Sequence, residues 1–338
     1  MLRVGRLGVD RLRRLPVHGL LSGRRGVRRL PSSKTHNESL EVASGIRGRR
    51  AGSVEVMQFA HLRAPESDQI HLAVIDGASA ILVADLLEAA PPTLQDLIDA
   101  GDGALTRIRD AIAAGRGTRH PIGDFGFASA VLAPPTVLAV GLNYAAHSSE
   151  LGLKTDSAPT VFTLWPNSLT GHEATTSWPR TLSESVDYEA ELGVIIGRPT
   201  KDVSEEDALG AVWGYTVVND ITARDIQFAE AQWSRCKSFD GFTPTGPVVV
   251  TADEVADPQD LHIWAVVDGH TVQDASTGQM VRSVAKLIAH LSTSITLQPG
   301  TLISTGSPGG AGYSRDPQIF LRDRSTVTVG IDGIGELT

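Results

Sequence analysis

Two glutamates stand two residues apart in the segment VDYEAEL, residues 186–192, which continues into an apolar run. In a β-strand, side chains two apart point to the same face, so Glu189 and Glu191 would form a pair of neighbouring carboxylates. Such a pair is unfavourable unless a cation neutralises it, and hard divalent cations such as Mg²⁺ or Mn²⁺ prefer oxygen ligands. The alternative is an edge strand with a solvated acidic face, and the segment by itself leaves both interpretations open.

A third carboxylate stands at the end of another apolar run, VWGYTVVND, residues 212–220. This places Asp220 at a predicted strand end, where functional groups are often found. Arg224 and Gln227 follow three residues apart, so they could share one face of a helix and offer hydrogen-bond donors to an anionic ligand. The alternative is that Asp220 caps the helix that follows, which is a common use of aspartate.

A histidine and a glutamate follow the apolar run VLAVGL, residues 137–142. His147 and Glu150 are three residues apart and would be neighbours on a helical turn. A carboxylate beside an imidazole raises its basicity and fixes its tautomer, which suits a general base that activates water. A surface ion pair is the alternative, because this spacing is a weak motif by itself.

Two further segments offer groups for an anionic substrate. Lys237 stands in WSRCKSFD, residues 233–240, and could pair with a substrate carboxylate or enolate, with a structural ion pair as the alternative. The glycine-rich run TGSPGGAG, residues 305–312, lacks the context of a dinucleotide-binding loop, so a backbone-lined loop that holds a carboxylate fits it better. The sequence has no GxSxG elbow and no P-loop, which argues against an α/β serine hydrolase and a nucleoside-triphosphate enzyme.

The elements that would carry these residues are mainly strands. Apolar runs punctuated by glycine and proline predict strands, and they do not alternate regularly with helices, which argues against a doubly wound parallel sheet. A curved mixed sheet, sandwich or barrel fits better. The clearest amphipathic helix is VRSVAKLIAHLS, residues 281–292. Strands are expected within residues 186–197, 212–220, 245–251, 261–269, 301–306 and 325–333.

A small α+β unit precedes these strands. The segments IHLAVIDG and SAILVADLL, residues 70–77 and 79–87, predict two strands joined by a turn at Asp76-Gly77. Two helices that each end at a glycine are expected within residues 91–101 and 104–115. We therefore expect a small accessory domain over residues 57–125 and a larger catalytic domain over residues 126–338.

The charge of the chain is unevenly distributed. The net charge is −9, but residues 1–50 carry 12 Arg and one Lys against three acids, a balance of +10, so the rest of the chain carries −19. Residues 1–56 fit a mitochondrial transit peptide, a disordered nucleic-acid-binding arm or a spurious extension before a true start at Met57, and we favour the last. The acidic body argues against non-specific binding to nucleic acid.

Other residue types indicate the cellular context. The single cysteine, Cys236, excludes an intrachain disulfide and favours a reducing compartment. No apolar run approaches the roughly 18 residues that a membrane-spanning helix needs, so we expect no membrane partner. We expect a cytoplasmic protein, or a mitochondrial one if residues 1–56 are a genuine transit peptide.

Seven segments, taken together and in this order, resemble the fumarylacetoacetate hydrolase family from about Val137 to the C-terminus. They are GLNYAAHSSELG, PTVFTLWPNSLTG, VDYEAELGVIIG, GYTVVNDITARDIQ, WSRCKSFDGFTPTGP, STGSPGGAG and GIDGIGEL. Each is a modest signal, whereas seven in the right order are very specific. The resemblance implies an α+β, mainly β fold with a mixed β-roll or barrel-like catalytic domain, usually in a homodimer.

The resemblance also assigns roles to the residues singled out above. It implies three ligands for a divalent cation, a water-activating dyad with a catalytic lysine, and three residues that contact a small keto-acid substrate. In that order they are Glu189, Glu191 and Asp220; His147 and Glu150 with Lys237; and Arg224, Gln227 and Ser307. The implied cation is Mg²⁺ or Mn²⁺, with Ca²⁺ as a further option.

The chemistry that the resemblance implies is hydrolysis of a C–C bond. The cation would polarise a 2-keto acid group, and His147 with Glu150 would activate the water that attacks an acylpyruvate-like or fumarylpyruvate-like substrate. Relatives with the same metal scaffold isomerise or decarboxylate hydroxymuconate-type diacids of aromatic catabolism, which needs no attacking water. A non-catalytic binding protein that kept the fold is the third interpretation.

Three positions depart from the family pattern. Leu164 stands where the family usually has Lys, Ala145 where Arg is frequent, and Ser307 where Thr is usual, a change that keeps the hydroxyl. Two cationic contacts are thus absent, so a doubly charged diacid would lose partners. We therefore expect a smaller or more apolar substrate.

Overall fold

The structure, a computed structural model, describes residues 56–338 except residue 66, residue 151 and residues 153–157. The predicted leader, up to residue 55, lies outside the described residues. All the described residues belong to one compact unit. Among them, no helix has the length and the apolar character to cross a membrane.

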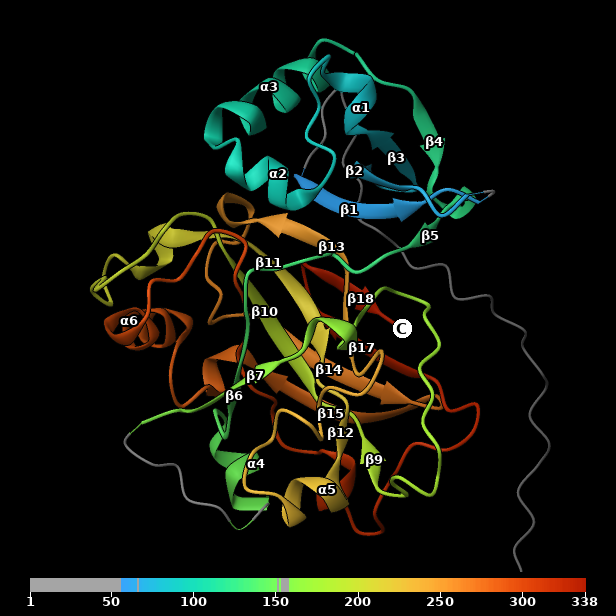
Figure 1. The fold of residues 1–338 in the computed structure, drawn as a ribbon, viewed down its shortest axis with the longest axis vertical. Coiled ribbons are helices and arrows are strands. Elements are labelled where there is room, and N and C mark those ends of the chain that lie inside the picture. The colour runs from blue at the N-terminus through green and yellow to red at the C-terminus, as the bar shows by residue number, and fades with distance from the viewer. Residues whose placement is uncertain (1–55, 66, 151, 153–157) are drawn as a thin grey trace, which may run out of the picture. The chain divides into compact units, whose positions relative to one another are not determined.

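One large mixed sheet contains twelve of the strands in the described part of the chain (Figure 1). Its path is β4 (Arg119–Pro121), β3 (Ser79–Leu82), β2 (Ile70–Asp76), β1 (Gln58–Arg63), β13 (Thr243–Thr251), β11 (Val212–Asn219), β10 (Ala190–Ile196), β16 (Leu302–Ser304), β6 (Val137–Gly141) and β7 (Thr160–Leu164). Off this path, β1 also pairs with β5 (Gly126–Phe127), and β13 also pairs with β8 (Leu169–Thr170). The pairs β16–β6 and β13–β8 are parallel, and the others are antiparallel.

Two smaller antiparallel sheets accompany the large one. The first pairs β9 (Val186–Asp187) with β12 (Thr222–Ala223). The second has the order β15 (His270–Ser276), β14 (His262–Val267), β17 (Val327–Ile331) and β18 (Gly335–Leu337). The predicted mainly β, α+β class with a mixed sheet is confirmed.

Few helices accompany the strands. The α-helices are α1 (Val83–Leu86), α2 (Leu94–Asp99), α3 (Asp102–Ala113), α4 (Ala145–Glu150), α5 (Arg224–Ala229) and α6 (Val284–Ser294). Short 3₁₀ helices lie in the connections at Ile122–Asp124, Pro166–Ser168, Ala208–Ala211, Ala252–Glu254, Thr277–Gln279 and Gly312–Ser314. The predicted amphipathic helix is present as α6, and Ser283 caps it by accepting a hydrogen bond from the Lys286 backbone N–H.

The large sheet is buried on both faces, and the alternation of side chains along β10 shows this. Leu192, Val194 and Ile196 belong to one hydrophobic cluster, which also contains the apolar face of α6 and residues of β14 and β17. Ile195 points the other way, into a second cluster that contains apolar residues of α2 and α3. Since neighbouring side chains on a strand point to opposite faces, β10 is fixed from both sides.

The structure corrects one sequence prediction and leaves another untested. The strand expected over residues 79–87 ends at Leu82, and α1 replaces its second half, because Val83 and Leu86 are three residues apart and bury the same helical face. The predicted turn at Asp76-Gly77 does join β2 to β3. The predicted domain boundary near residue 125 stays a prediction, since β1 pairs with β13 and both parts share one sheet.

Candidate active site

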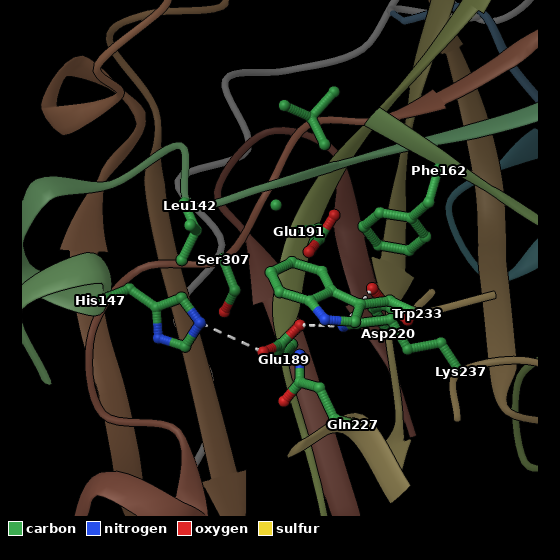
Figure 2. Close-up of a pocket in the computed structure, with 12 residues that line it drawn as sticks. Leu142, His147, Phe162, Glu189, Glu191, Asp220, Gln227, Trp233, Lys237 and Ser307 are labelled. Atoms are coloured by element: carbon green, nitrogen blue, oxygen red, sulfur yellow. Dashed lines mark hydrogen bonds and ion pairs between the residues drawn. The ribbon is translucent and has the colours of Figure 1, made fainter. Parts of the chain in front are cut away.

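Three carboxylates meet at one edge of the paired strands β10 and β11. Ala190 pairs with Asn219 in this antiparallel ladder, so the start of β10 and the end of β11 lie side by side. Glu191 stands on β10, Glu189 directly before it, and Asp220 directly after β11. One oxygen from each carboxylate lies within 4.8 Å of the other two, and all three side chains are buried (Figure 2).

Hydrogen bonds fix the positions of these carboxylates. The Asp220 backbone N–H donates to the Glu189 carbonyl at 2.9 Å, and the Glu189 N–H donates to Asn219 Oδ1 at 3.1 Å. On the other side, Glu191 Oε2 accepts from Ser304 Oγ at 2.5 Å and from the Gly306 N–H at 2.9 Å. Three chain segments that are distant in sequence, 189–191, 219–220 and 304–306, therefore hold the three carboxylates together.

The chemistry of the three carboxylates fits a divalent cation. Asp220 Oδ1 is buried and has no hydrogen-bond partner among the described residues. Burial, and then the charges of Asp220 and Glu189, raise the pKa of Glu191 to about 8, and burial raises the pKa of Asp220 to about 6. A divalent cation would stabilise the charged forms, and oxygen donors are the ligands that Mg²⁺ and Mn²⁺ prefer.

Lys237 bridges two of the carboxylates. Its Nζ donates to Glu189 Oε2 at 2.6 Å, to Asp220 Oδ2 at 2.7 Å and to Thr222 Oγ1 at 2.9 Å. Burial alone would lower the pKa of Lys237, but the charges of Asp220 and Glu189 outweigh burial and raise it. Lys237 is therefore a fixed ammonium that offsets part of the carboxylate charge.

Arg224 donates hydrogen bonds to three residues at the site. It is fully buried at the start of α5, and its guanidinium donates to Asp187 Oδ1 at 2.7 Å, to Glu189 Oε1 at 2.6 Å and to Gln227 Oε1 at 2.9 Å. Burial would raise the pKa of Glu189, but Arg224 and Lys237 hold it well below its usual range. Arg224 does not line the pocket, so its predicted contact with substrate stays a prediction, whereas its bonds to Glu189 and Gln227 are direct.

His147, on α4, faces the carboxylates from the opposite side. Its Nε2 lies 3.2 Å from Glu189 Oε1, and its Nδ1 lies 3.8 Å from Glu150 Oε2, which is too long for a hydrogen bond. The Glu150 carboxylate instead accepts hydrogen bonds from the Gly310 N–H at 3.0 Å and from Ser314 Oγ at 2.9 Å. Burial alone would lower the pKa of His147, but Glu150 and Glu189 outweigh it and raise that pKa.

Seven of the nine predicted site residues line one pocket, and the other two, Arg224 and Glu150, contact members of that group. The seven are His147, Glu189, Glu191, Asp220, Gln227, Lys237 and Ser307. Ser307 Oγ accepts a hydrogen bond from Gln273 Nε2 at 2.8 Å, which fixes the hydroxyl inside the pocket. The residues that the sequence assigned to one site therefore do lie together in the fold. Their individual roles stay predictions.

Sequence reasoning did not identify several residues that shape the site. Asp187 binds Arg224, and its spacing of two from Glu189 was a signal that could have found it. Gln273 on β15 also accepts from the Ala190 N–H at 2.9 Å, but no motif marks a residue so distant in sequence. The remaining pocket lining is Val140, Gly141, Leu142, Phe162 and Trp233, which sequence reasoning did not single out.

Comparisons with known proteins agree with this geometry. A family model described as "Fumarylacetoacetate (FAA) hydrolase C-terminal" matches residues 136–338. A protein from Burkholderia ambifaria, named only provisionally as a hydrolase, is 47% identical over 201 residues, which cover 59% of this chain and 71% of that protein.

Two solved structures share the fold over most of the chain. Maleylpyruvate hydrolase from Sphingobium sp. SYK-6, in complex with manganese(II) and pyruvate, is 28% identical with a TM-score of 0.69, and the match covers 83% of this chain and 97% of that one. 2-Hydroxyhepta-2,4-diene-1,7-dioate isomerase from Mycobacterium marinum is 30% identical with a TM-score of 0.64, over 83% and 96% of the two chains. The chain described here belongs to the fumarylacetoacetate hydrolase family.

Proposed function

We propose that the protein is a divalent-metal-dependent hydrolase that cleaves a C–C bond in a 2,4-diketo acid of the acylpyruvate or fumarylpyruvate type. The observation that carries this proposal is the buried group of Glu189, Glu191 and Asp220 with the His147 imidazole beside it. A base next to a carboxylate-bound cation is what metal-assisted hydrolysis requires. Similarity to a maleylpyruvate hydrolase that binds manganese and pyruvate supports this reaction class.

The proposed ligands of the cation are Glu189, Glu191 and Asp220. Mg²⁺ or Mn²⁺ is favoured, with Ca²⁺ as a further candidate, because all three take oxygen ligands. A bound divalent cation would supply Lewis acidity toward the oxygens of a keto acid. Lys237 would limit the repulsion between Glu189 and Asp220 during the reaction, since its ammonium contacts both of them.

His147 is the proposed base. Glu150 and Glu189 raise the pKa of its imidazole, and its Nδ1 has no hydrogen-bond partner among the described residues. His147 would take a proton from the attacking water and return it to the CH₂ carbon, which leaves as the methyl group of pyruvate. In this reaction R–CO–CH₂–CO–COO⁻ and water yield R–COO⁻, pyruvate (CH₃–CO–COO⁻) and one proton. The oxygen of the water therefore ends in R–COO⁻.

The remaining polar residues of the pocket would orient the substrate. Gln227 is held by Arg224 through its Oε1, which leaves its amide nitrogen as a donor to a substrate oxygen. Ser307 accepts from Gln273 and can turn its own hydroxyl hydrogen toward a substrate carboxylate. Both side chains line the pocket beside the carboxylates, so both could contact a bound keto acid.

Isomerisation or decarboxylation of a hydroxymuconate-type diacid is the second candidate. The similarity to the Mycobacterium marinum isomerase favours it. Those reactions need a stabilised enolate and a proton transfer, but they need no attacking water. A non-catalytic binding protein is the third candidate, and the convergence of His147 and Lys237 on three buried carboxylates counts against it.

A substrate screen tests the proposal. Acylpyruvates and hydroxymuconates are mixed with the protein and Mg²⁺ or Mn²⁺, the loss of the conjugated enol is followed by absorbance, and products are identified by mass spectrometry. We expect pyruvate and a carboxylic acid, formed only with the cation. A product with the mass of its substrate would support an isomerase, and no turnover of any compound would support a binding protein.

A further inference from the structure

The candidate pocket has an apolar part that the proposed chemistry does not use. We define the apolar rim as four residues that line the pocket, Val140, Leu142, Phe162 and Trp233. Figure 2 shows Leu142 on the side of His147, and Phe162 and Trp233 on the side of Lys237. Leu142 and Trp233 are half-buried, so their side chains are accessible to a ligand. The carboxylates are therefore flanked by apolar surface on two sides.

Leu142 adopts a backbone conformation that leucine rarely takes. Its φ is 59°, in the left-handed region where a Cβ is crowded and where glycine is favoured. The residue directly follows β6, and its carbonyl accepts a hydrogen bond from Ser148 Oγ at 3.3 Å. A strained residue that the surrounding structure holds in a pocket wall points to a role for its side chain.

Gly141 leaves space for the Trp233 ring, which forms the other side of the apolar rim. A Cβ at this position would lie 2.3 Å from the Trp233 ring, so any larger residue here would force that ring to move. The Trp233 ring also meets the Phe162 ring at a steep angle, with centroids 5.6 Å apart. The indole is thus packed onto the end of β6, next to the strained Leu142.

Within the part of the chain that the structure describes, the pocket lining offers no separate cation to a second substrate carboxylate. Lys237 is the one Lys or Arg among the described residues that line the pocket, and its ammonium already donates to three acceptors. Lys237 and one divalent cation would together balance the three carboxylates, while the charge of Arg224 is shared between Glu189 and the buried Asp187. A second substrate carboxylate would lie against apolar side chains, and such a charge is costly to desolvate. Leu164, buried on β7 near Phe162, adds no charge.

We propose that the apolar rim binds the acyl tail of the substrate, that this tail is uncharged and apolar, and that Leu142 is a specificity-determining residue. The inference rests on the proposed hydrolysis of a 2,4-diketo acid and narrows it. The keto-acid end would lie at the carboxylates and Ser307, and a branched alkyl or aryl tail would lie against Leu142 and Trp233. Fumarylpyruvate-like diacids would be poor substrates.

The test compares two acylpyruvates of the same shape. Succinylpyruvate ends in a carboxylate, and 4-methylpentanoylpyruvate carries an isopropyl group at the same place. Steady-state kcat/KM is measured for both with Mn²⁺, and binding of both to the Mn²⁺-loaded protein is measured by calorimetry. We expect at least about a tenfold preference for the isopropyl compound in kcat/KM, the scale that a few apolar contacts supply.

Leu142→Gly separates specificity from stability. Glycine accepts the positive φ freely, so the melting temperature should stay the same or rise, while KM for the isopropyl compound rises about tenfold and kcat changes little. Asp202→Gly is the matched control, because Asp202 also has a positive φ, of 49°, but its side chain is 68% exposed on the surface. It should leave the preference unchanged. Leu142→Lys should improve kcat/KM for succinylpyruvate.

The outcomes distinguish this inference from the proposed function. If the wild type hydrolyses both compounds and prefers succinylpyruvate, the inference is overturned and the proposed function stands. An unchanged preference in Leu142→Gly would remove Leu142 from the specificity of the site. If neither compound is hydrolysed with any cation, the proposed function fails, and calorimetry still reports whether the isopropyl compound binds more tightly.

Discussion

At the scale of single residues, the site consists of carboxylates that repel one another in a buried place. Lys237 and Arg224 compensate Glu189, which keeps its pKa low, whereas the pKa values of Glu191 and Asp220 are raised. The protein itself thus neutralises only part of the charge that it has gathered. A bound divalent cation would supply the missing positive charge, so we expect metal binding to depend most on the two residues with raised pKa values.

We predict that Glu191→Gln weakens Mn²⁺ binding without unfolding the protein. The amide has the shape of the protonated carboxyl group and can still accept from Ser304 and the Gly306 N–H, so the metal-free melting temperature should not fall. The dissociation constant for Mn²⁺, measured by calorimetry, should rise by more than the roughly 10–100-fold that loss of an outer-shell partner costs. Glu184→Gln, on an exposed side chain, is the control. Equal affinities in all three proteins would refute the assigned ligand role.

We predict that His147→Ala nearly abolishes turnover while Mn²⁺ still binds. Loss of a general base typically costs about 10²–10⁴-fold in rate, and His147 is not one of the three proposed ligands. His290→Ala, on the exposed face of α6, should leave kcat unchanged. Turnover that survives in His147→Ala would exclude the water-activating role and favour isomerisation.

The sequence supplied the polar residues of the site but not their exact contacts. The spacing of Glu189 and Glu191 predicted two neighbouring carboxylates, and their oxygens do lie close together, with Glu191 on β10 and Glu189 directly before it. The spacing of His147 and Glu150 predicted that they are neighbours, and their side chains do lie 3.8 Å apart, but Glu150 also accepts hydrogen bonds from the Gly310 N–H and from Ser314 Oγ. Such donors depend on the path of a distant loop, which local spacing does not encode. The apolar rim was missed because apolar residues in strands look like core.

At the scale of elements, the proposed site residues lie at strand ends and in short connections, and tertiary contacts fix these segments. His61, which lies away from the site, shows how a buried side chain fixes such segments. On β1, its Nδ1 lies 3.1 Å from the Ser129 carbonyl, and its Nε2 accepts from the Leu94 N–H at 3.0 Å. One neutral imidazole therefore satisfies a buried carbonyl and the first turn of α2, and it has its proton on Nδ1.

We predict that His61 makes stability fall in acid. Burial outweighs its backbone contacts and lowers the pKa of His61, so below about pH 6.5 the unfolded state binds the proton more readily than the folded state. The contribution is fully present above the unfolded value and is lost as the pH falls below it. Urea unfolding between pH 7.5 and 5 should show a smaller pH slope in His61→Gln than in the wild type. Equal slopes would contradict this.

The sequence predicted the existence of most of these strands and helices better than it predicted the residues at which they end. Apolar runs predicted β2, β11, β13, β14 and β17, and amphipathic spacing predicted α6, because these patterns directly reflect burial. The run over residues 79–87 was misread as one strand, since a continuous apolar run does not distinguish a strand from a short buried helix. The pairing of β1 with β13 joins residues nearly two hundred positions apart, as in Phe59 with Val249, and no local pattern specifies it.

At the scale of the whole molecule, the large sheet ends in an edge strand. On the path of the described strands, β7 is the last. Val161 on this strand is 37% exposed, and Trp165 directly after it is 44% exposed. An apolar edge strand is a usual place for contact with another chain. The family resemblance implies a homodimer, and this edge is compatible with one.

We predict that the protein is a homodimer in solution. Light scattering coupled to size exclusion should give twice the 35.8 kDa of the chain at micromolar concentration. Cross-linking at the same concentration should give one band of doubled mass. A monomeric mass across the whole elution peak would contradict the prediction, and it would leave the catalytic proposal intact, since all the proposed site residues come from one chain.

We propose that three buried carboxylates support metal-dependent attack of water on a 2,4-diketo acid. The most direct test is product analysis of an acylpyruvate reaction in ¹⁸O-labelled water with Mn²⁺, run in parallel after chelation. We expect pyruvate and a carboxylic acid that carries one ¹⁸O from solvent in its carboxylate, with no product in the chelated sample. An unlabelled isomer or decarboxylated product, or full turnover after chelation, would contradict it.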